Sequence, residues 1–342
     1  MCIRDRSYRH LILVSIFFVV QVGPGAAQQT SGAAVGWSVP RTSAGHPDLQ
    51  GIWANDSATP LERPDGFAEK AVLTDEEFAT LKERAAELTS ASSDAGFLDE
   101  VFRAAANDAE EFESLCAGTG NYNNFWLTER YFENRTSLIV DPPDGRIPYT
   151  SEARQEMEEQ LAGFFSSEPV ASWEELGLLT RCVTNGLPNL LPGYNTNYQI
   201  LQTSDYVMIL QELMHEARVI PLNGGAHIDS NIRQWLGDSR GHWEGETLVI
   251  TTKNFNSKTS IRGSSEHVRL VERYTRVGPN TMHYEFMVDD DTRFTRSWAA
   301  MIPLQKIEGP IFEYACHEGN YGLVGILAGA RADDAAAQAG GR

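Results

Sequence analysis

The second half of the chain is a series of short apolar segments separated by turn residues, and this pattern restricts the folds that the chain can adopt. Consecutive strands joined by short turns pair antiparallel, whereas a parallel pair needs a crossover connection of about a dozen residues or more. An antiparallel series of this length avoids exposed sheet edges by closing into a barrel. The predicted strands are 198–203, 206–212, 218–222, 247–252, 268–277, 282–288, 293–304 and 311–315.

Two connections in this series have hairpin character. Ser204-Asp205 separates the first two predicted strands, and Gly278-Pro279-Asn280 separates the strands 268–277 and 282–288. Short turn-forming sequences between apolar runs are typical of β-hairpins. Farther upstream, Gly51-Ile52-Trp53 predicts an earlier strand.

Helical patterns precede the strands. Residues 73–115 are predicted to be helical, with Thr74 and Glu77 in a capping-box arrangement at the start and a second helical stretch from about 97. A further helix is predicted at 150–165, and a short strand within 135–146 ends in a Pro/Gly turn. We therefore expect a mainly β (α+β) fold, an antiparallel barrel with a helical annex.

These elements divide the chain into segments. Residues 46–331 are predicted to form a single domain, in which 46–190 supply the annex and first strands and 191–331 the barrel. Residues 332–342 are predicted to be a disordered tail, because they are rich in small and polar residues.

The N-terminus has the order of a secretory signal peptide. Arg4, Arg6 and Arg9 precede the apolar run 11–22, and the small residues Gly25-Ala26-Ala27 follow it. We expect residues 1–27 to be removed, 28–45 to be a flexible leader, and the protein to be periplasmic or secreted. A misassigned start of the reading frame is the alternative explanation of the first residues.

The composition limits the partners. The 342 residues have a formal net charge of −19, which argues against nucleic acid and against an anionic membrane surface as partners. No segment after the signal peptide is long and apolar enough to predict a membrane span. A small-molecule ligand is the expected partner, and the sequence makes no prediction of the oligomeric state.

Three cysteines remain after cleavage, Cys116, Cys182 and Cys316. An oxidising compartment permits one disulfide and leaves one thiol. The pair Cys182–Cys316 is favoured because both residues lie in dense, motif-like surroundings. Three reduced, buried thiols are the alternative.

The first candidate for chemistry is Glu212, His215 and Arg218 at the junction of two predicted strands. Side chains alternate along a strand, so Glu212 and His215 converge only if the chain bends between them. The functional interpretation is a carboxylate that orients a general base beside a cation. A polar outward row at the end of a strand is the alternative.

The second candidate is the segment 235–245, in which two tryptophans bracket charged residues and three glycines predict a tight turn. Asp238 and Arg240 are expected to pair, and Asp238, Arg240 and His242 are candidate ligand contacts. A structured hairpin with packed tryptophans is the alternative.

The third candidate is the segment 313–321, where His317 is a candidate acid and Glu318 a candidate ligand contact beside Cys316. A metal site here needs at least three convergent ligands, and adjacent residues on a strand diverge. No cofactor is therefore predicted, with a metal site and a disulfide-pinned corner as alternatives.

The fourth candidate is Glu272, which shares one strand face with Val268, Leu270 and Tyr274. If this face is the barrel interior, Glu272 is a carboxylate among apolar side chains, where burial favours acid–base chemistry. A salt bridge to an inward-facing arginine on a neighbouring strand is equally compatible with the pattern.

The fifth signal is asparagine interleaved with aromatic residues, which suits a sugar or an oxygenated ring compound. Loop capping by asparagine is the alternative. The candidate ligand contacts are Asn123, Asn124, Trp126, Tyr194 and Asn197.

Four of these segments together resemble a widespread family of exported bacterial proteins. They are 46–53 (HPDLQGIW), 135–148 (RTSLIVDPPDGRIP), 235–245 (WLGDSRGHWEG) and 313–320 (EYACHEGN), spread over residues 45–331. The resemblance implies export but no particular activity. The β half is also similar to a lipocalin-type barrel, a likeness of fold that does not determine function.

Three functions are compatible with this sequence. The first is an enzyme without a nucleotide cofactor that transfers protons in hydrolysis, elimination, hydration or isomerisation of an oxygenated compound or saccharide. It predicts that His215, Glu212, Arg218, Glu272 and His317 converge in one pocket. The second is a periplasmic binding or carrier protein, and the third is a structural envelope protein with a barrel filled by side chains.

Overall fold

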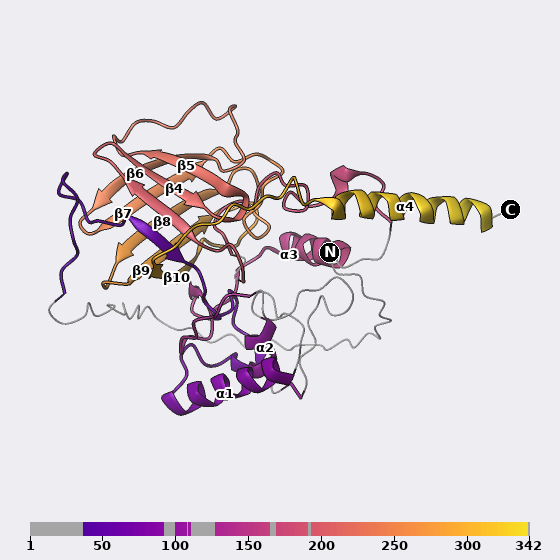
Figure 1. Cartoon of the computed structure of the whole chain (residues 1–342), viewed down its shortest axis with the longest axis horizontal. Helices are drawn as coiled ribbons and strands as arrows, with labels where there is room; N and C mark the ends of the chain where they lie inside the picture. Colours follow the sequence, from indigo (N-terminus) through magenta and orange to yellow (C-terminus); the bar gives the residue numbers. More distant parts are fainter. Residues whose placement is uncertain are drawn as a thin grey trace.

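The computed structural model describes residues 37–91, 100–107, 109–110, 127–164, 169–190 and 193–340. The predicted signal peptide, Cys116, Asn123, Asn124 and Trp126 lie outside these residues. The strands of the described chain form one antiparallel, nearly closed barrel (Figure 1).

Nine strands form the barrel wall. Their order is β5-β4-β3-β1-β10-β9-β8-β7-β6, and β2 (Ile139–Asp141) pairs with the first part of β10. The wall strands are β1 (Gly51–Ala54), β3 (Tyr198–Gln202), β4 (Tyr206–Gln211), β5 (Glu216–Pro221), β6 (Asp238–Glu244), β7 (Thr247–Lys253), β8 (Arg269–Arg276), β9 (Thr281–Asp289) and β10 (Trp298–Ile307).

The barrel has one seam, between β5 and β6. All neighbouring pairs along the strand order are antiparallel, so the strand direction alternates from β5 to β6. An odd number of alternating strands leaves the first and the last pointing the same way. The connection 222–237 therefore returns along the height of the barrel, and β5 and β6 do not continue the antiparallel ladder.

Side chains close this seam. A Cβ on Gly241 in β6 would lie only 2.9 Å from Leu222 and 3.0 Å from Ile220, so glycine lets β5 approach closely. The returning connection is held against β6, because Arg240 Nε donates to Ala226 O at 3.0 Å and His227 Nδ1 lies 2.7 Å from Asp238 Oδ2.

Large side chains fill the barrel interior. The most buried are Trp53, Tyr274, Tyr284, Phe286 and Trp298. The side chains that alternation places on one face of β8 point into the barrel, since Leu270, Tyr274 and their neighbours on β9 belong to one buried cluster and Glu272 is fully buried. Tyr274 and Tyr284 stack with their ring centroids 4.5 Å apart.

The helices lie outside the barrel wall (Figure 1). They are α1 (Asp75–Ala91), α2 (Glu100–Ala106), α3 (Ser151–Phe164) and α4 (Tyr321–Gly340), with short 3-10 turns at η1 (Asp65–Phe67), η3 (Trp173–Glu175) and η4 (Leu213–His215). Helices α1 and α2 share an apolar cluster of their own. The predicted capping box is confirmed, because Glu77 N donates to Thr74 Oγ1 at 3.3 Å and Thr74 N to Glu77 Oε2 at 3.0 Å.

The mainly β fold with N-terminal helices is confirmed, but three local predictions differ from the structure. Residues 238–244, predicted as part of a tight turn, form β6, because the two glycines with a positive φ, Gly237 (66°) and Gly245 (59°), flank the strand and Gly241 does not need one. Residues 311–315 form no strand. The tail beyond Arg331 continues α4 as far as Gly340, since its alanines favour a helix.

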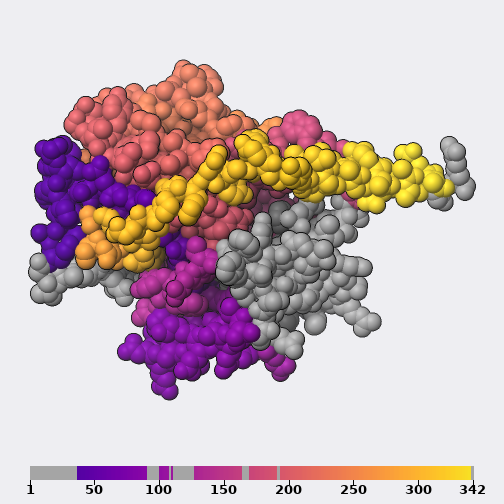
Figure 2. Space-filling model, in the orientation of Figure 1, coloured from indigo at the N-terminus to yellow at the C-terminus, as the bar shows by residue number. Residues whose placement is uncertain are grey.

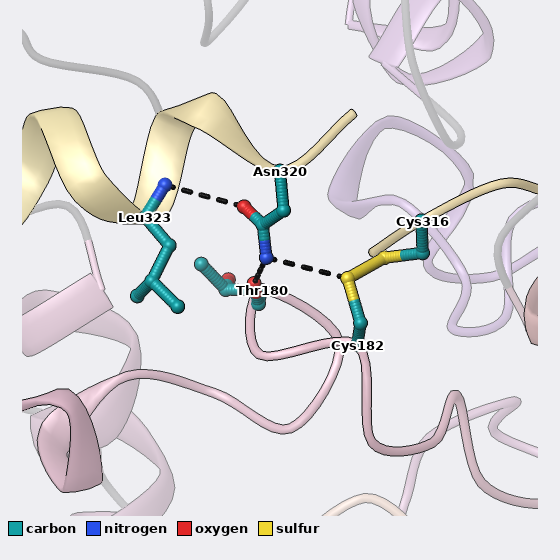
Figure 3. Close-up of a disulfide and its surroundings, with 5 residues drawn as sticks. All are labelled: Thr180, Cys182, Cys316, Asn320 and Leu323. Carbon is teal, nitrogen blue, oxygen red and sulfur yellow. Dashed lines mark hydrogen bonds between the residues drawn. A yellow bond between two sulfur atoms is a disulfide. The ribbon is translucent and has the colours of Figure 1, made fainter. Parts of the chain in front are cut away.

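The disulfide Cys182–Cys316 is present, which confirms the favoured pair. Asn320 follows it and caps α4 by accepting from Leu323 N at 3.2 Å (Figure 3). Its amide also donates to Thr180 O at 2.9 Å, so the start of α4 is fastened beside the disulfide. From there α4 extends away from the barrel (Figure 2). Among the described residues, no helix combines the length and apolar character that a membrane span requires.

Candidate functional site

One end of the barrel collects most of the polar side chains of interest. Strands β1, β4, β7 and β9 finish at this end and β3, β5, β6, β8 and β10 begin there, because neighbouring strands alternate in direction. Helix α3 reaches it, since Thr150 N donates to Arg293 O in the β9–β10 connection at 2.9 Å. We call it the α3 end.

A short segment after β1 forms the floor of the site. Asn55, Ser57 and Thr59 are buried and line one cavity, while Asp56 and Ala58 lie on the other side of the segment. Side chains of an extended chain alternate in this way. The segment therefore separates two polar surfaces at the α3 end.

The cavity beside Asn55, Ser57 and Thr59 has a volume of about 340 Å³. Helix α3 covers it, and Ile302 of β10 contributes to its apolar wall. Small-molecule sites are typically apolar cavities of about 300–1,000 Å³ with a few placed polar groups. The remaining lining residues are Leu61, Glu62, Arg103, Leu138, Ile147, Tyr149, Arg154, Met157, Glu158, Leu161, Leu190 and Arg262.

Tyr149 lies between two arginines of this cavity. Its hydroxyl donates to Arg262 O at 2.9 Å, and the Arg154 guanidinium lies 5.3 Å from its ring centroid. Burial, followed by the charge of Glu62, raises the pKa of Tyr149 to about 12. The phenol is therefore neutral at physiological pH and can donate one hydrogen bond.

On the other side of the segment, Asp56 is held by two hydroxyls. Thr128 Oγ1 and Thr196 Oγ1 both donate to Asp56 Oδ1 at 3.1 Å. Burial raises the pKa of the Asp56 carboxyl, although these hydroxyls and Arg130 favour its charged form. Thr128 and Ala58 also border a second hollow of about 820 Å³ beside α1 and α2.

Glu272 and Arg218 meet inside the barrel. Arg218 Nη1 and Nη2 lie 2.7 and 2.8 Å from the two oxygens of Glu272. The hydroxyls of Tyr284 and Tyr274 donate to Glu272 Oε1 at 2.8 and 3.2 Å. The structure therefore contains the salt-bridge alternative for Glu272, in which the two opposite charges pair with each other.

The five predicted catalytic residues do not share one pocket. Glu212 is buried and accepts from Asn197 Nδ2 at 2.7 Å and from Phe312 N at 2.8 Å. The bend that convergence requires occurs, with Met214 and His215 at φ 63° and 43°, but it leaves the His215 side chain exposed. His317 is exposed as well, beside Cys316. Their expected convergence is thus incorrect, because the barrel wall encloses Glu272 and Arg218 and excludes both histidines.

The candidates on β6 have structural partners. Asp238 accepts from Arg240 Nη1 at 2.7 Å and holds His227, so the predicted Asp238–Arg240 pair is present. His242 is exposed and lies 3.0 Å from Glu244. The His227 contact fastens the connection before β6 to this strand, whereas the Asp238–Arg240 and His242–Glu244 pairs lie within β6 itself.

Residues 237–241 also have the Gly-x-Ser-x-Gly spacing of a hydrolase nucleophile turn, which places the serine between a strand and a helix. Here Ser239 lies inside β6, and its Oγ is 2.9 Å from Thr252 Oγ1 and 3.5 Å from Arg218 Nη1. The serine therefore lacks the exposed strand-to-helix turn that makes such a residue a nucleophile.

The remaining predicted ligand contacts are dispersed. Tyr194 is partly exposed and stacks on Tyr314 with centroids 6.5 Å apart, Asn197 binds Glu212, and Glu318 is exposed. Within the part of the chain that the structure describes, no group of three or more His, Cys, Asp and Glu side chains is arranged to hold a metal ion.

The fold and this cavity define a barrel protein with a small-molecule-sized cavity at one end. Comparisons of the chain with family models, with curated proteins and with solved structures found no match. The function is therefore argued from the site alone.

Sequence reasoning missed the residues that form the cavity. Tyr149, Arg154 and Arg262 come from three unrelated segments, and Thr59 lies in a loop after β1. The one available signal was the cluster of polar residues directly after the Gly-Ile-Trp strand, Asn55 to Thr59.

Proposed function

We propose that the protein binds a small organic molecule in the cavity between the α3 end of the barrel and helix α3. The observation that carries this proposal is a cavity of about 340 Å³ with an apolar wall and a few placed polar groups. The packed interior agrees with the structural-protein alternative, but the cavity lies outside that interior. We favour binding over catalysis because the five predicted catalytic residues do not lie together in one pocket.

We further propose that binding takes place outside the cytoplasm. The disulfide Cys182–Cys316 supports this location, because disulfides persist in oxidising compartments. Expression of the full chain in bacteria followed by mass spectrometry of the periplasmic fraction tests the export proposal. A mature N-terminus at Gln28 supports it, and an uncleaved chain in the cytoplasm contradicts it.

Fluorescence of N-phenyl-1-naphthylamine tests the binding proposal. The wild type should give a saturable increase in probe fluorescence, because an apolar cavity excludes water from the dye. Met157→Trp fills the α3 side of the cavity and should abolish the increase. Val219→Trp is the matched control, since Val219 is exposed on β5 and does not line the cavity.

Two results contradict the binding proposal. One is the absence of any saturable signal with the wild type, and the other is an undiminished signal with Met157→Trp. Circular dichroism of each variant shows that the barrel has folded, so a lost signal is not a lost fold.

A proton-transfer activity centred on Asp56 is the second candidate function. One Asp56 oxygen is held by two hydroxyls, and its raised pKa suits it to exchange protons near neutrality more readily than an ordinary aspartate. Nuclear magnetic resonance of a panel of small esters and hydroxy acids tests for turnover. Product formation should be lost in Asp56→Asn and kept in His215→Ala, and equal turnover by Asp56→Asn contradicts the role.

A further inference from the structure

Two of the three arginines that line the cavity, Arg154 and Arg262, differ from most other arginines of this acidic chain. Most described arginines form ion pairs with carboxylates, as Arg269 does with Asp289 and Arg273 with Glu244. Arg154 and Arg262 form no ion pair among the residues that the structure describes, although the chain has 47 acidic residues. Two guanidinium groups without an ion-pair partner, Arg154 exposed and Arg262 partly exposed, thus line one cavity.

The carboxylates of the same cavity do not neutralise them. Glu62 Oε1 accepts from Ile147 N at 2.9 Å, which holds this side chain at the chain turn before α3. Glu158 follows Arg154 by one helical turn and is exposed, but no ion pair joins the two. The Arg154 guanidinium instead faces the Tyr149 ring and makes a long contact of 3.5 Å with Ile147 O.

A buried hydroxyl provides a second, independent sign of a ligand. Thr59 is 3% exposed and lines the cavity, and its Oγ1 has no hydrogen-bond partner in the described structure. A buried hydroxyl without a partner is unfavourable, because it loses its hydration and gains no hydrogen bond in return. An oxygen atom of a bound ligand would satisfy it.

The rest of the cavity is apolar and small. Leu138, Ile147 and Ile302 are buried in its wall. A volume of about 340 Å³ is at the lower end of the range of small-molecule sites, so a long acyl chain does not fit.

We propose that the cavity selects an organic anion, a compact apolar or aromatic body with a single carboxylate that lies between Arg154 and Arg262. The inference rests on the proposed binding function and names its ligand class. The carboxylate supplies the missing counter-charge, and a second oxygen of the ligand accepts from Thr59. Charge-assisted hydrogen bonds of this kind are about twice as strong as neutral ones.

Isothermal titration calorimetry with 4-phenylbutyrate and its neutral amide tests the ligand class. The two compounds have nearly the same shape, so their affinities differ through the charge and the second acceptor oxygen of the carboxylate. The wild type should bind the carboxylate about tenfold or more tightly than the amide. Arg154→Gln and Arg262→Gln should each remove most of this difference and leave amide binding unchanged.

Arg273→Gln is the matched control. It removes the same charge from an exposed arginine of β8 that pairs with Glu244 and does not line the cavity. It should keep the preference for the carboxylate. Retained amide binding in the cavity variants shows that the site has folded.

The outcomes separate the ligand class from the proposed function. Equal affinity of the wild type for carboxylate and amide overturns the ligand class and leaves the binding function in place. Binding of the naphthyl probe without binding of either compound also overturns the class alone. If neither compound nor the naphthyl probe binds, the binding function is contradicted as well.

Discussion

The Arg218–Glu272 pair shows how single residues determine what the barrel interior can do. Glu272 is 0% exposed and Arg218 6% exposed, so both charges lose hydration on folding. Burial disfavours the charged guanidinium, but the adjacent Glu272 outweighs burial and raises the pKa of Arg218 above its ordinary value. Arg218 therefore keeps its charge, and its two contacts with Glu272 tie β5 to β8.

Breaking one side of this pair should be costly. We expect Arg218→Met to lower the free energy of unfolding by about 3–5 kcal/mol, because it leaves a buried, unpaired carboxylate. Arg218→Met with Glu272→Gln should be more stable than Arg218→Met alone, because glutamine is neutral and still accepts from Tyr284 and Tyr274. Urea unfolding measures each value, and a double variant as unstable as the sum of the two single variants contradicts the coupling.

Asp56 should make the folding stability depend on pH in the opposite direction from an ordinary ion-paired aspartate. Burial raises its pKa in the folded chain above the ordinary 3.8, so the native state binds the proton more readily than the unfolded state. Stability from this group is present below the ordinary value and is lost as the pH rises through the raised folded value.

We therefore expect Asp56→Asn to gain stability relative to the wild type as the pH rises from about 3 to about 7. Thermal unfolding of both proteins across this range measures the difference in melting temperature. A difference that is constant with pH, or that moves in favour of the wild type, contradicts the raised pKa.

Strand alternation alone predicted that Glu272 shares one face with Leu270 and Tyr274, because every second residue of a strand points the same way. Its partner was not predictable, since Arg218 lies three strands away around the barrel on the far side of the seam. Asp56 was missed for a different reason. An aspartate after a strand resembles any loop residue until Thr128 and Thr196 are brought beside it.

Among the elements, the seam between β5 and β6 depends on a small residue. Gly241→Val should lower the free energy of unfolding by about 1–3 kcal/mol, because the added methyl groups would overlap Leu222 and Ile220. Gly177→Val is the control, since a Cβ at Gly177 meets open space. Urea unfolding compares the two, and equal stability of Gly241→Val and the wild type would show that the seam is loose.

The disulfide joins the loop before β3 to the segment before α4. Cys182→Ser should lower the free energy of unfolding by about 2–4 kcal/mol, because the bond closes a loop of 134 residues. Cys316→Ser should cost the same, and the double variant should cost no more than either, because each change breaks the same bond. Additive losses in urea unfolding contradict this account.

The apolar pattern of the sequence predicted the existence of most strands better than it predicted their boundaries. The strands from β3 to β5 and from β7 to β10 follow apolar runs, so they were predictable. Strand β6 was not, because its glycines and charges resemble a turn until Gly241 packs on β5. The segment 311–315 has the residues of a strand but remains unpaired, since Glu212 takes its Phe312 amide.

For the whole molecule, the antiparallel barrel with N-terminal helices was predictable from the order of segments. The position of the ligand cavity was not. Sequence motifs predicted functional residues on β6, in the Cys316 segment and in the barrel interior. In these places the structure contains structural hydrogen bonds, a disulfide and packed side chains. The cavity is instead formed where Asn55–Thr59, α3 and Arg262 meet, which only the fold brings together.

A crystal structure of the protein with 4-phenylbutyrate tests the central claim most directly. We predict that the carboxylate lies between the guanidinium groups of Arg154 and Arg262, with the phenyl group against Leu138 and Ile302. A ligand found inside the strand ring beside Glu272, or on a surface away from α3, would contradict the assignment of the site.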